Sequence, residues 1–194
     1  MAGKRAATLA RGVLSPPLAL SQKDTPMKRL VPLVAAALSL LIGNAQAGPE
    51  NVKSPGDYRA NFTHYYSGDR TANNTQIIRV YANDIALEGA KKEGKLPYGS
   101  VLVGELYSAK LDASGQPLKS SLGRRIANTL EVLVVMERGA GFDADYPEAL
   151  KVGDWEFAVF SPDGQRLDKD ITACRACHNP LSDQEFLFSY DHLK

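Results

Sequence analysis

Two cysteines and a histidine near the C-terminus constrain this 194-residue chain more than any other feature. Cys174 and Cys177 are separated by two residues, and His178 follows directly. Cys-x-x-Cys-His is the attachment motif of c-type haem. It places two thiols one helical turn apart, within reach of the two vinyl groups of one porphyrin, and puts an imidazole under the iron. We therefore expect one covalent haem c, held by Cys174 and Cys177, with His178 as the proximal iron ligand.

Two other uses of a cysteine pair fit the sequence less well. A thioredoxin-like dithiol starts a helix within a βαβ unit, and no such unit precedes Cys174. A closed zinc site needs two more ligands, and His64 and His192 are the only other histidines. Haem attachment is the favoured interpretation.

The segment before residue 48 has the pattern of an export signal. Residues 27–29 are a short positive start, residues 30–42 are apolar, and Ala-Gln-Ala at residues 45–47 is a small-x-small cleavage site. The apolar stretch is short for a bilayer span, which favours cleavage after Ala47 over anchoring. We predict a signal peptide at residues 27–47, no stable membrane span, and a periplasmic or secreted protein.

Residues 1–26 contain scattered Arg, Ser and Pro without a periodic apolar pattern, so we interpret them as an upstream extension before a start at Met27. An organelle transit sequence is the alternative, because the segment contains Arg and is nearly free of acids. The mature part, residues 48–194, is predicted to form a single domain.

Charge is distributed unevenly along the chain. Residues 1–47 hold six Lys or Arg and one Asp, which leaves 17 basic against 21 acidic residues, a formal charge of −4, in residues 48–194. No basic stripe remains for a nucleic-acid backbone, so we expect no nucleic-acid partner. With 44% hydrophobic and 8% aromatic residues, the composition is typical of one globular domain and excludes a disordered chain.

The order of local patterns predicts an α+β fold. Three strand-like runs between residues 100 and 160 follow one another, joined by turns too short for helical crossovers, so the sheet should be mostly antiparallel. We expect flanking helices and a C-terminal haem-binding helix, with the haem between that helix and the sheet. Strands are predicted at residues 76–81, 100–112, 128–138 and 155–160, and helices at residues 55–66, 84–93 (capped by Asn83), 171–178 and 183–190 (capped by Ser182), with a loop at 67–75.

The sequence supplies no obvious sixth ligand for the iron. No Met follows His178, and Met136 lies in an apolar strand-like run where a core side chain is the simpler interpretation. His64 and His192 are favoured as ordinary histidines. We expect an open sixth position and hence binding or chemistry on a small molecule. A six-coordinate electron-transfer cytochrome with Met136 as ligand is the alternative.

The order of the motifs resembles the cytochrome P460 family over about residues 54–192. Besides the haem motif, the resemblance depends on four segments: Arg-Val-Tyr-Ala-Asn at 79–83, Leu-Pro-Tyr-Gly-Ser-Val-Leu-Val-Gly-Glu at 96–105, Asp-Trp-Glu-Phe at 154–157, and Phe-Leu-Phe-Ser-Tyr at 186–190. It implies a β-rich monohaem protein with five-coordinate iron, usually a homodimer, that binds or oxidises small nitrogen species. We also expect a redox partner cytochrome.

Two branches of that family differ at one lysine. The resemblance implies that members with a lysine bonded to the porphyrin edge are enzymes that oxidise hydroxylamine. Members without that bond, the cytochromes c′-beta, bind nitric oxide or related gases. Gly104 stands at the place where that lysine is expected. If the match to the family is shifted along the strand, Lys110 is the candidate for the cross-linking lysine, because it lies on the same strand face as Gly104 by the two-residue period. Otherwise Lys110 is a solvated lysine at the strand end. Lys95 is a poorer candidate for the cross-link. Whether the protein is an enzyme is left open.

A proton acceptor near the iron would serve hydroxylamine oxidation, because that reaction releases protons. Glu131 is the most suggestive carboxylate, since it interrupts an apolar run, although a place on the outer face of the sheet, by alternation with Leu130 and Val132, is the favoured interpretation. Arg79 and Tyr107 are possible partners of a bound ligand or of the haem propionates. We take Glu131, Arg79 and Lys110 as the candidate catalytic residues.

Overall fold

A computed structural model of the chain describes residues 47–194. The chain divides into two units, Met1–Leu41 and Ile42–Lys194, and every described residue belongs to the second. The predicted extension at residues 1–26 and the predicted signal peptide up to residue 46 lie outside the described residues. Among the residues that are described, no helix is both long and apolar enough to cross a bilayer.

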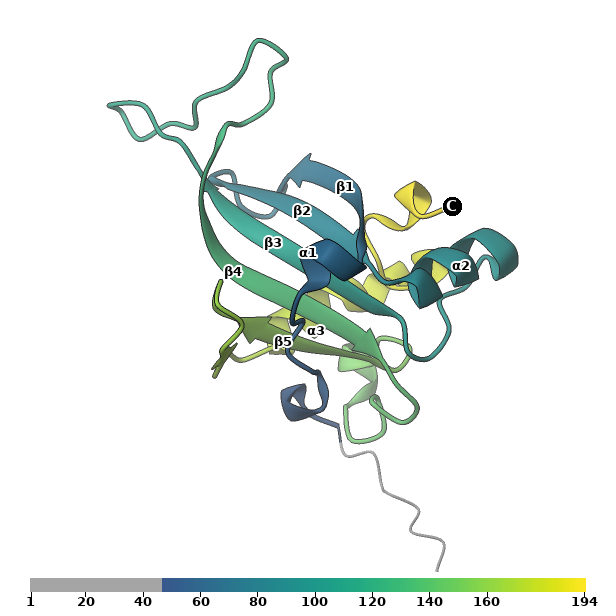
Figure 1. Ribbon diagram of the computed structural model, residues 1–194. Coiled ribbons are helices and arrows are strands. Elements are labelled where there is room, and N and C mark those ends of the chain that lie inside the picture. Colours follow the sequence, from purple (N-terminus) through teal and green to yellow (C-terminus); the bar gives the residue numbers. More distant parts are fainter. Residues whose placement is uncertain (1–46) are drawn as a thin grey trace, which may run out of the picture. The chain divides into compact units, whose positions relative to one another are not determined.

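Six antiparallel strands form one sheet in which each strand pairs with its neighbour in sequence (Figure 1). This meander, with helices beside it, confirms the predicted α+β fold with a mostly antiparallel sheet. The strands are β1 (Thr63–Asp69), β2 (Gln76–Ala82), β3 (Val101–Ala109), β4 (Ala127–Arg138), β5 (Trp155–Phe160) and β6 (Arg166–Leu167).

Short helical elements flank the sheet. The longest, α2, begins after Asn83, whose side chain accepts a hydrogen bond from the backbone N–H of Ala86, and ends at Gly94, which has a φ of 64°. Both ends are those that the sequence predicts. The helical elements are η1 (Pro49–Asn51), α1 (Tyr58–Asn61), α2 (Asp84–Glu93), η2 (Glu148–Leu150), α3 (Thr172–His178), η3 (Asn179–Gln184) and η4 (Tyr190–His192).

The predicted helix at residues 55–66 is mostly wrong. Only α1 is helical, and the segment from Thr63 onward is β1, which also takes up the start of the predicted loop at 67–75. Thr63, Tyr65 and Tyr66 are β-branched or aromatic residues that fit a pleated surface, and pairing with β2 supplies the backbone hydrogen bonds of this segment.

The predicted helix at residues 183–190 is also wrong. The 3-10 turn η3 ends at Gln184, and Glu185 and Phe186 follow with φ values of 51° and 62°. Two consecutive left-handed residues end any helix, so the capping role that we predicted for Ser182 does not arise.

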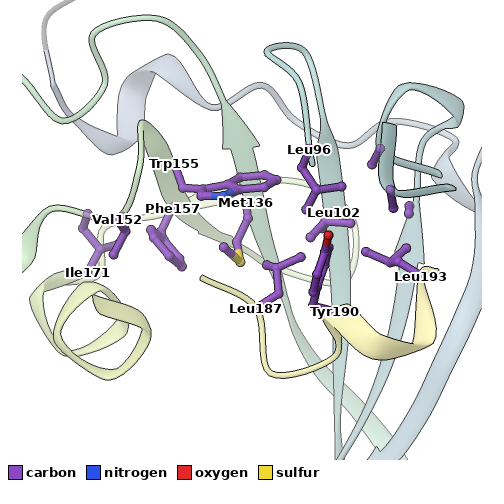
Figure 2. Close-up of a cluster of buried hydrophobic side chains, with 13 residues drawn as sticks. Leu96, Leu102, Met136, Val152, Trp155, Phe157, Ile171, Leu187, Tyr190 and Leu193 are labelled. Atoms are coloured by element: carbon purple, nitrogen blue, oxygen red, sulfur yellow. The ribbon is translucent and has the colours of Figure 1, made fainter. Parts of the chain in front are cut away.

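The two faces of the sheet are covered by opposite ends of the described chain. The cross-strand row Ala82, Leu102, Met136 and Phe157 marks one face, which packs against Ile171 and the segment after α3 (Figure 2). We call it the C-terminal face. The next row, Arg79, Glu105, Leu133 and Phe160, marks the N-terminal face, which is covered by Val52 and Tyr58. Burial of each large apolar side chain between these layers stabilises the fold by roughly 1.5–3 kcal/mol.

A hairpin of residues 110–126 extends beyond β3 and β4, and we call it the arm (Figure 1). Isolated bridges pair Leu111 with Pro117 and Lys119 with Arg125. The predicted turn at residues 112–115 is present: Asp112 Oδ1 accepts hydrogen bonds from the backbone N–H groups of Ser114 and Gln116. The strand predicted to reach residue 112 ends earlier, at Ala109, because pairing with β4 gives way to the arm.

Candidate haem site

Helix α3 presents both motif cysteines beside the C-terminal face. It begins where Asp170 Oδ1 accepts a hydrogen bond of 2.9 Å from the backbone N–H of Thr172. Cys174 is half-buried and Cys177 is exposed, and both are free thiols. Burial raises the pKa of the Cys174 thiol, and the positive charge of Arg70 partly offsets this. Two reduced thiols one helical turn apart are the pair that thioether attachment requires.

His178 is oriented by a backbone carbonyl. Its Nδ1 atom lies 2.6 Å from the backbone oxygen of Phe186, and its ring lies edge-on to Phe157 and Phe188, with centroids 5.1 Å away in both cases. Because a carbonyl oxygen only accepts, Nδ1 carries the proton and Nε2 keeps its lone pair. Burial lowers the pKa of His178. The residue is thus a neutral imidazole with a metal-binding nitrogen free, which is the form that ligates iron.

The carbonyl that orients His178 comes from the left-handed turn at Glu185 and Phe186. Non-glycine residues rarely have positive φ, so the surroundings must hold this turn. Glu185 Oε2 accepts hydrogen bonds from Arg138 Nη1 at 2.5 Å and from the backbone N–H of Leu96 at 3.2 Å. The backbone oxygen of Glu185 accepts one of 3.1 Å from Trp155 Nε1. These contacts fix the position of the carbonyl that orients His178.

Arg175, one of the two spacer residues of the motif, anchors α3 to the protein. Its side chain is fully buried and forms ion pairs with Glu156 and Asp143. It also donates hydrogen bonds to the backbone oxygens of Leu150 and Trp155, both at 2.9 Å. A buried guanidinium with carboxylate and carbonyl partners fixes a helix rigidly, since losing one partner would leave a buried charge unpaired.

The sheet beside His178 has an apolar surface that the described chain leaves half-exposed. Gly104 lies at its centre, paired with Val80 and Val134. A Cβ atom at Gly104 would lie 2.8 Å from Val134 Cγ2 and 3.3 Å from Ile78 Cδ1, so this surface is closely packed laterally. Half-buried valines and isoleucine on central strands are unusual, and a flat apolar group such as a porphyrin would cover them. The half-buried residues are Ile78, Val132, Val134 and Val159.

A polar chain of residues borders this apolar surface. Arg70, in the turn between β1 and β2, donates a hydrogen bond of 2.5 Å to Gln76 Oε1, and Gln76 Nε2 donates one of 3.2 Å to Glu131. The positive charge of Arg70 lowers the pKa of both Cys174 and His178, although burial has the larger effect on each. A cation and a carboxylate thus share one edge of the surface beside the motif.

The turn that carries Arg70 and Gln76 is itself held from the base of the arm. Arg125 Nη1 donates hydrogen bonds to the backbone oxygens of Arg70, Asn73 and Gln76 at 2.9, 3.1 and 2.9 Å. Three carbonyls on one guanidinium nitrogen fix the turn, and therefore the polar edge, relative to the sheet.

A comparison with protein families matches residues 55–189 to Cytochrome P460. The chain belongs to the cytochrome P460 family. This confirms the resemblance found in the sequence, and it makes the chain a member of a family of haem proteins. The donor set fits that cofactor: two free thiols, an imidazole with a free Nε2 and a bare apolar surface beside it. A search of curated proteins returned no match.

The structure places the three candidate catalytic residues of this cytochrome P460 family member apart. Glu131 lies at the polar edge described above, exposed and bonded to Gln76. Arg79 lies on the N-terminal face, with its guanidinium 4.7 Å from the centroid of the Tyr107 ring. Arg79 and Tyr107 are therefore on the opposite face of the sheet from His178. Lys110 is exposed at the base of the arm, six residues and therefore about 20 Å of extended strand from Gly104.

The residues considered as alternative iron ligands have other surroundings. Met136 is buried in the core cluster of the C-terminal face, near Leu187 (Figure 2). His64 Nε2 lies 2.9 Å from Ser67 Oγ, and the His192 ring packs on Tyr66 with centroids 4.7 Å apart. Within residues 47–194, no three His, Cys, Asp or Glu side chains gather as a metal site of the zinc type.

Sequence reasoning missed Arg70, Gln76 and the anchoring role of Arg175. Arg70 was assigned to a polar loop, and nothing in its local pattern indicates that its charge acts on Cys174 and His178. Arg175 occupies a variable position of the haem motif. A charged residue there gives no sign of burial until its carboxylate partners, 19 and 32 residues earlier in the chain, are placed around it.

Proposed function

We propose that this protein is a periplasmic or secreted c-type monohaem cytochrome whose five-coordinate iron binds small nitrogen species. Cys174 and Cys177 would hold the haem by thioether bonds, and His178 would ligate the iron through Nε2. The observation that carries the proposal is the hydrogen bond between His178 Nδ1 and the Phe186 oxygen, because it leaves Nε2 free and pointing away from that carbonyl.

The haem, when bound, supplies an iron with one coordination position for a ligand and the ability to exchange electrons. The residues of the chain act around it. Phe157 and Phe188 hold the plane of His178, and the apolar surface around Gly104 keeps water from the bound group. Arg70 offers a fixed cation for a carboxylate or for negative charge on a ligand.

Binding of nitric oxide or a related gas, without a lysine cross-link, is the branch that we favour. Gly104 stands where the lysine is expected, and Val134 and Ile78 crowd the space that a side chain there would need. Lys110 lies too far along the chain from Gly104 to take its place without a rearrangement of the arm. A smooth apolar surface suits an uncharged diatomic ligand, which needs no partner of its own.

Hydroxylamine oxidation is the second candidate, and the polar edge supports it. Glu131 is a carboxylate held by Gln76, and it could take up a proton at its Oε atoms as a bound ligand loses one. Arg70, two hydrogen bonds away, would keep that carboxylate oriented. A homodimer and a redox partner cytochrome remain part of this proposal.

The test is spectroscopic. Protein exported with c-type haem maturation should retain its colour on the polypeptide after acid-acetone extraction, and its ferrous form should be high-spin and bind carbon monoxide and nitric oxide. Extraction of free haem would contradict the thioether bonds. A low-spin ferrous spectrum that becomes high-spin in Met136→Ala would support the electron-transfer alternative instead.

The two branches are separated by a peptide map. Without a cross-link, the haem carries only the tryptic peptides of the motif, residues 170–175 and 176–194, and hydroxylamine turnover is weak or absent. If the haem also carries the peptide of Lys110, the enzyme branch is correct, and Lys110→Ala should abolish turnover while keeping the haem. Glu131→Gln should then lower hydroxylamine turnover and leave carbon monoxide binding unchanged.

A further inference from the structure

The backbone nitrogen of Gly48 lies in a buried cluster of charged groups. It donates a hydrogen bond of 2.9 Å to Glu156 Oε2, and both residues are buried. Tyr146 donates its hydroxyl to the same oxygen at 3.1 Å. The other oxygen, Oε1, accepts hydrogen bonds of 2.9 Å from Arg175 and from the backbone N–H of Phe157. The carboxylate thus joins the start of the described chain to the haem motif.

Among residues 47–194, the charged side chains of this cluster do not balance. Asp143 and Glu156 are two carboxylates, and Arg175, which pairs with both, is the one cation bonded to them in this described part of the chain. An excess buried negative charge is costly unless a further positive group pairs with it. The negative charge of Glu156 also raises the pKa of Tyr146, after the larger effect of burial, to about 12.

Gly48 is the residue that follows the predicted cleavage site. Hydrolysis of the bond between Ala47 and Gly48 consumes one water, leaves a carboxylate on Ala47, and leaves Gly48 with an amine that takes up a proton. We propose that this new α-ammonium group of Gly48 forms an ion pair with Glu156, so that removal of the leader completes the buried cluster that anchors the haem-binding helix.

The surroundings of Gly48 fit a charged terminus. The nearest side-chain atoms to a Cβ built at residue 48 are those of the Glu50 carboxylate, so a second anionic group lies against this residue. The backbone oxygen of Gly48 accepts a hydrogen bond of 3.1 Å from the N–H of Asn51, which fixes the residue in place. The inference uses the exported state from the proposed function, but it does not depend on what the haem binds.

The burial of Gly48 sets the order of events. A peptidase cannot reach a bond whose nitrogen is buried, so cleavage must precede folding of this end. Leader removal during export satisfies that order. The ammonium group then enters the cluster as the strands and α3 assemble around Glu156.

The experiment inserts one alanine between Ala47 and Gly48. Cleavage after Ala47 is retained, since cleavage one residue later would put Gln46 at the small position, and intact mass identifies the first residue. The insertion leaves an amide at Gly48 and moves the ammonium group from buried Glu156 to the place of the Ala47 nitrogen, which lies 3.3 Å from the exposed Asp145 Oδ2. An exposed pair of this kind contributes little to stability. We expect the thermal midpoint of the exported holoprotein to fall by about 5 °C. In the Glu156→Gln background, the same insertion should lower the thermal midpoint little, because the ion pair is already absent.

Chemical labelling gives a second measurement that needs no variant at Glu156. If the pair raises the pKa of the amine by one unit, its labelling by an amine-reactive reagent at neutral pH should be about 10-fold slower in the wild type than in the insertion variant. The inference would be overturned if the wild type and the insertion variant had equal thermal midpoints or equal labelling rates. It would also be overturned if the mature wild-type chain did not start at Gly48. Carbon monoxide spectra of the same samples report separately on the proposed function.

Discussion

His178 Nδ1 and the backbone oxygen of Phe186 lie 2.6 Å apart because Glu185 and Phe186 form a left-handed turn. The His178 imidazole is therefore positioned by a segment that follows the Cys-x-x-Cys-His motif, not by the helix that carries it. Without this turn, the imidazole of His178 could rotate, and the Phe186 carbonyl would no longer fix the proton on Nδ1.

Replacement of Glu185 by Ala should loosen that turn. The variant loses the contacts to Arg138 and to the Leu96 amide, so we expect the free energy of unfolding to fall by about 1–3 kcal/mol. Resonance Raman spectra of the ferrous protein should show a weaker iron–histidine bond. Glu88→Ala, which removes an exposed pair with Lys92, is the control and should leave both measurements unchanged. Equal behaviour of the two variants would contradict the positioning role.

Gly104→Ala should overpack the apolar surface of the sheet. Its Cβ atom would lie 2.8 Å from Val134 Cγ2, and inserting a methyl group into such a contact costs about 1–3 kcal/mol. Val134→Ala removes the obstructing atoms, so the double variant should be more stable than the sum of the two single changes indicates. Denaturant unfolding of the four proteins measures this coupling. Purely additive changes would mean that Val134 does not limit the space at Gly104.

The neighbouring residues Arg124 and Arg125 should differ sharply on replacement by Ala. Arg125 donates to three backbone oxygens of the turn at residues 70–76, so its loss should cost about 2 kcal/mol and speed hydrogen exchange in that turn. Arg124 is largely exposed and lies 3.7 Å from Asp69, so its replacement should change stability little. Similar exchange rates in both variants would show that the turn holds without Arg125.

Tyr65 should make the protein sensitive to alkaline pH. Burial raises the pKa of its hydroxyl to about 12, and the hydroxyl lies 2.7 Å from Ser189 Oγ. Because the folded pKa lies above the unfolded value of about 10, the neutral phenol stabilises the fold below pH 10, and this contribution is lost as the pH rises toward 12. Tyr65→Phe should reduce the slope of unfolding free energy against pH in that range by up to about 1.4 kcal/mol per pH unit. An unchanged slope would contradict this assignment.

The sequence predicts those parts of the fold whose signal is local. The cap at Asn83, the end at Gly94, the turn at residues 112–115 and the central strands follow from side chains within a few residues of each element. The helix expected at 183–190 fails because Glu185 is held by Arg138 and Trp155, which lie far away in the chain. Local propensity cannot report such contacts.

The candidate site divides in the same way. Cys174, Cys177 and His178 are recognised from spacing alone, because attachment to one porphyrin requires that spacing. Arg70 and Gln76 reach the site only because Arg125 draws their turn against the base of the arm. Arg79 is a plausible partner of a bound ligand or of the haem propionates by residue type. Successive residues of β2 point to opposite faces, however, so Arg79 lies on the other face from Ile78 and Val80.

The meander has a consequence for how the protein is made. Every strand pairs with the strand before it, so each hairpin can form as soon as its second strand is available, and the order of assembly follows the order of synthesis. The motif lies behind all six strands in the chain. The apolar surface of the sheet can therefore form before the Cys-x-x-Cys-His segment becomes available.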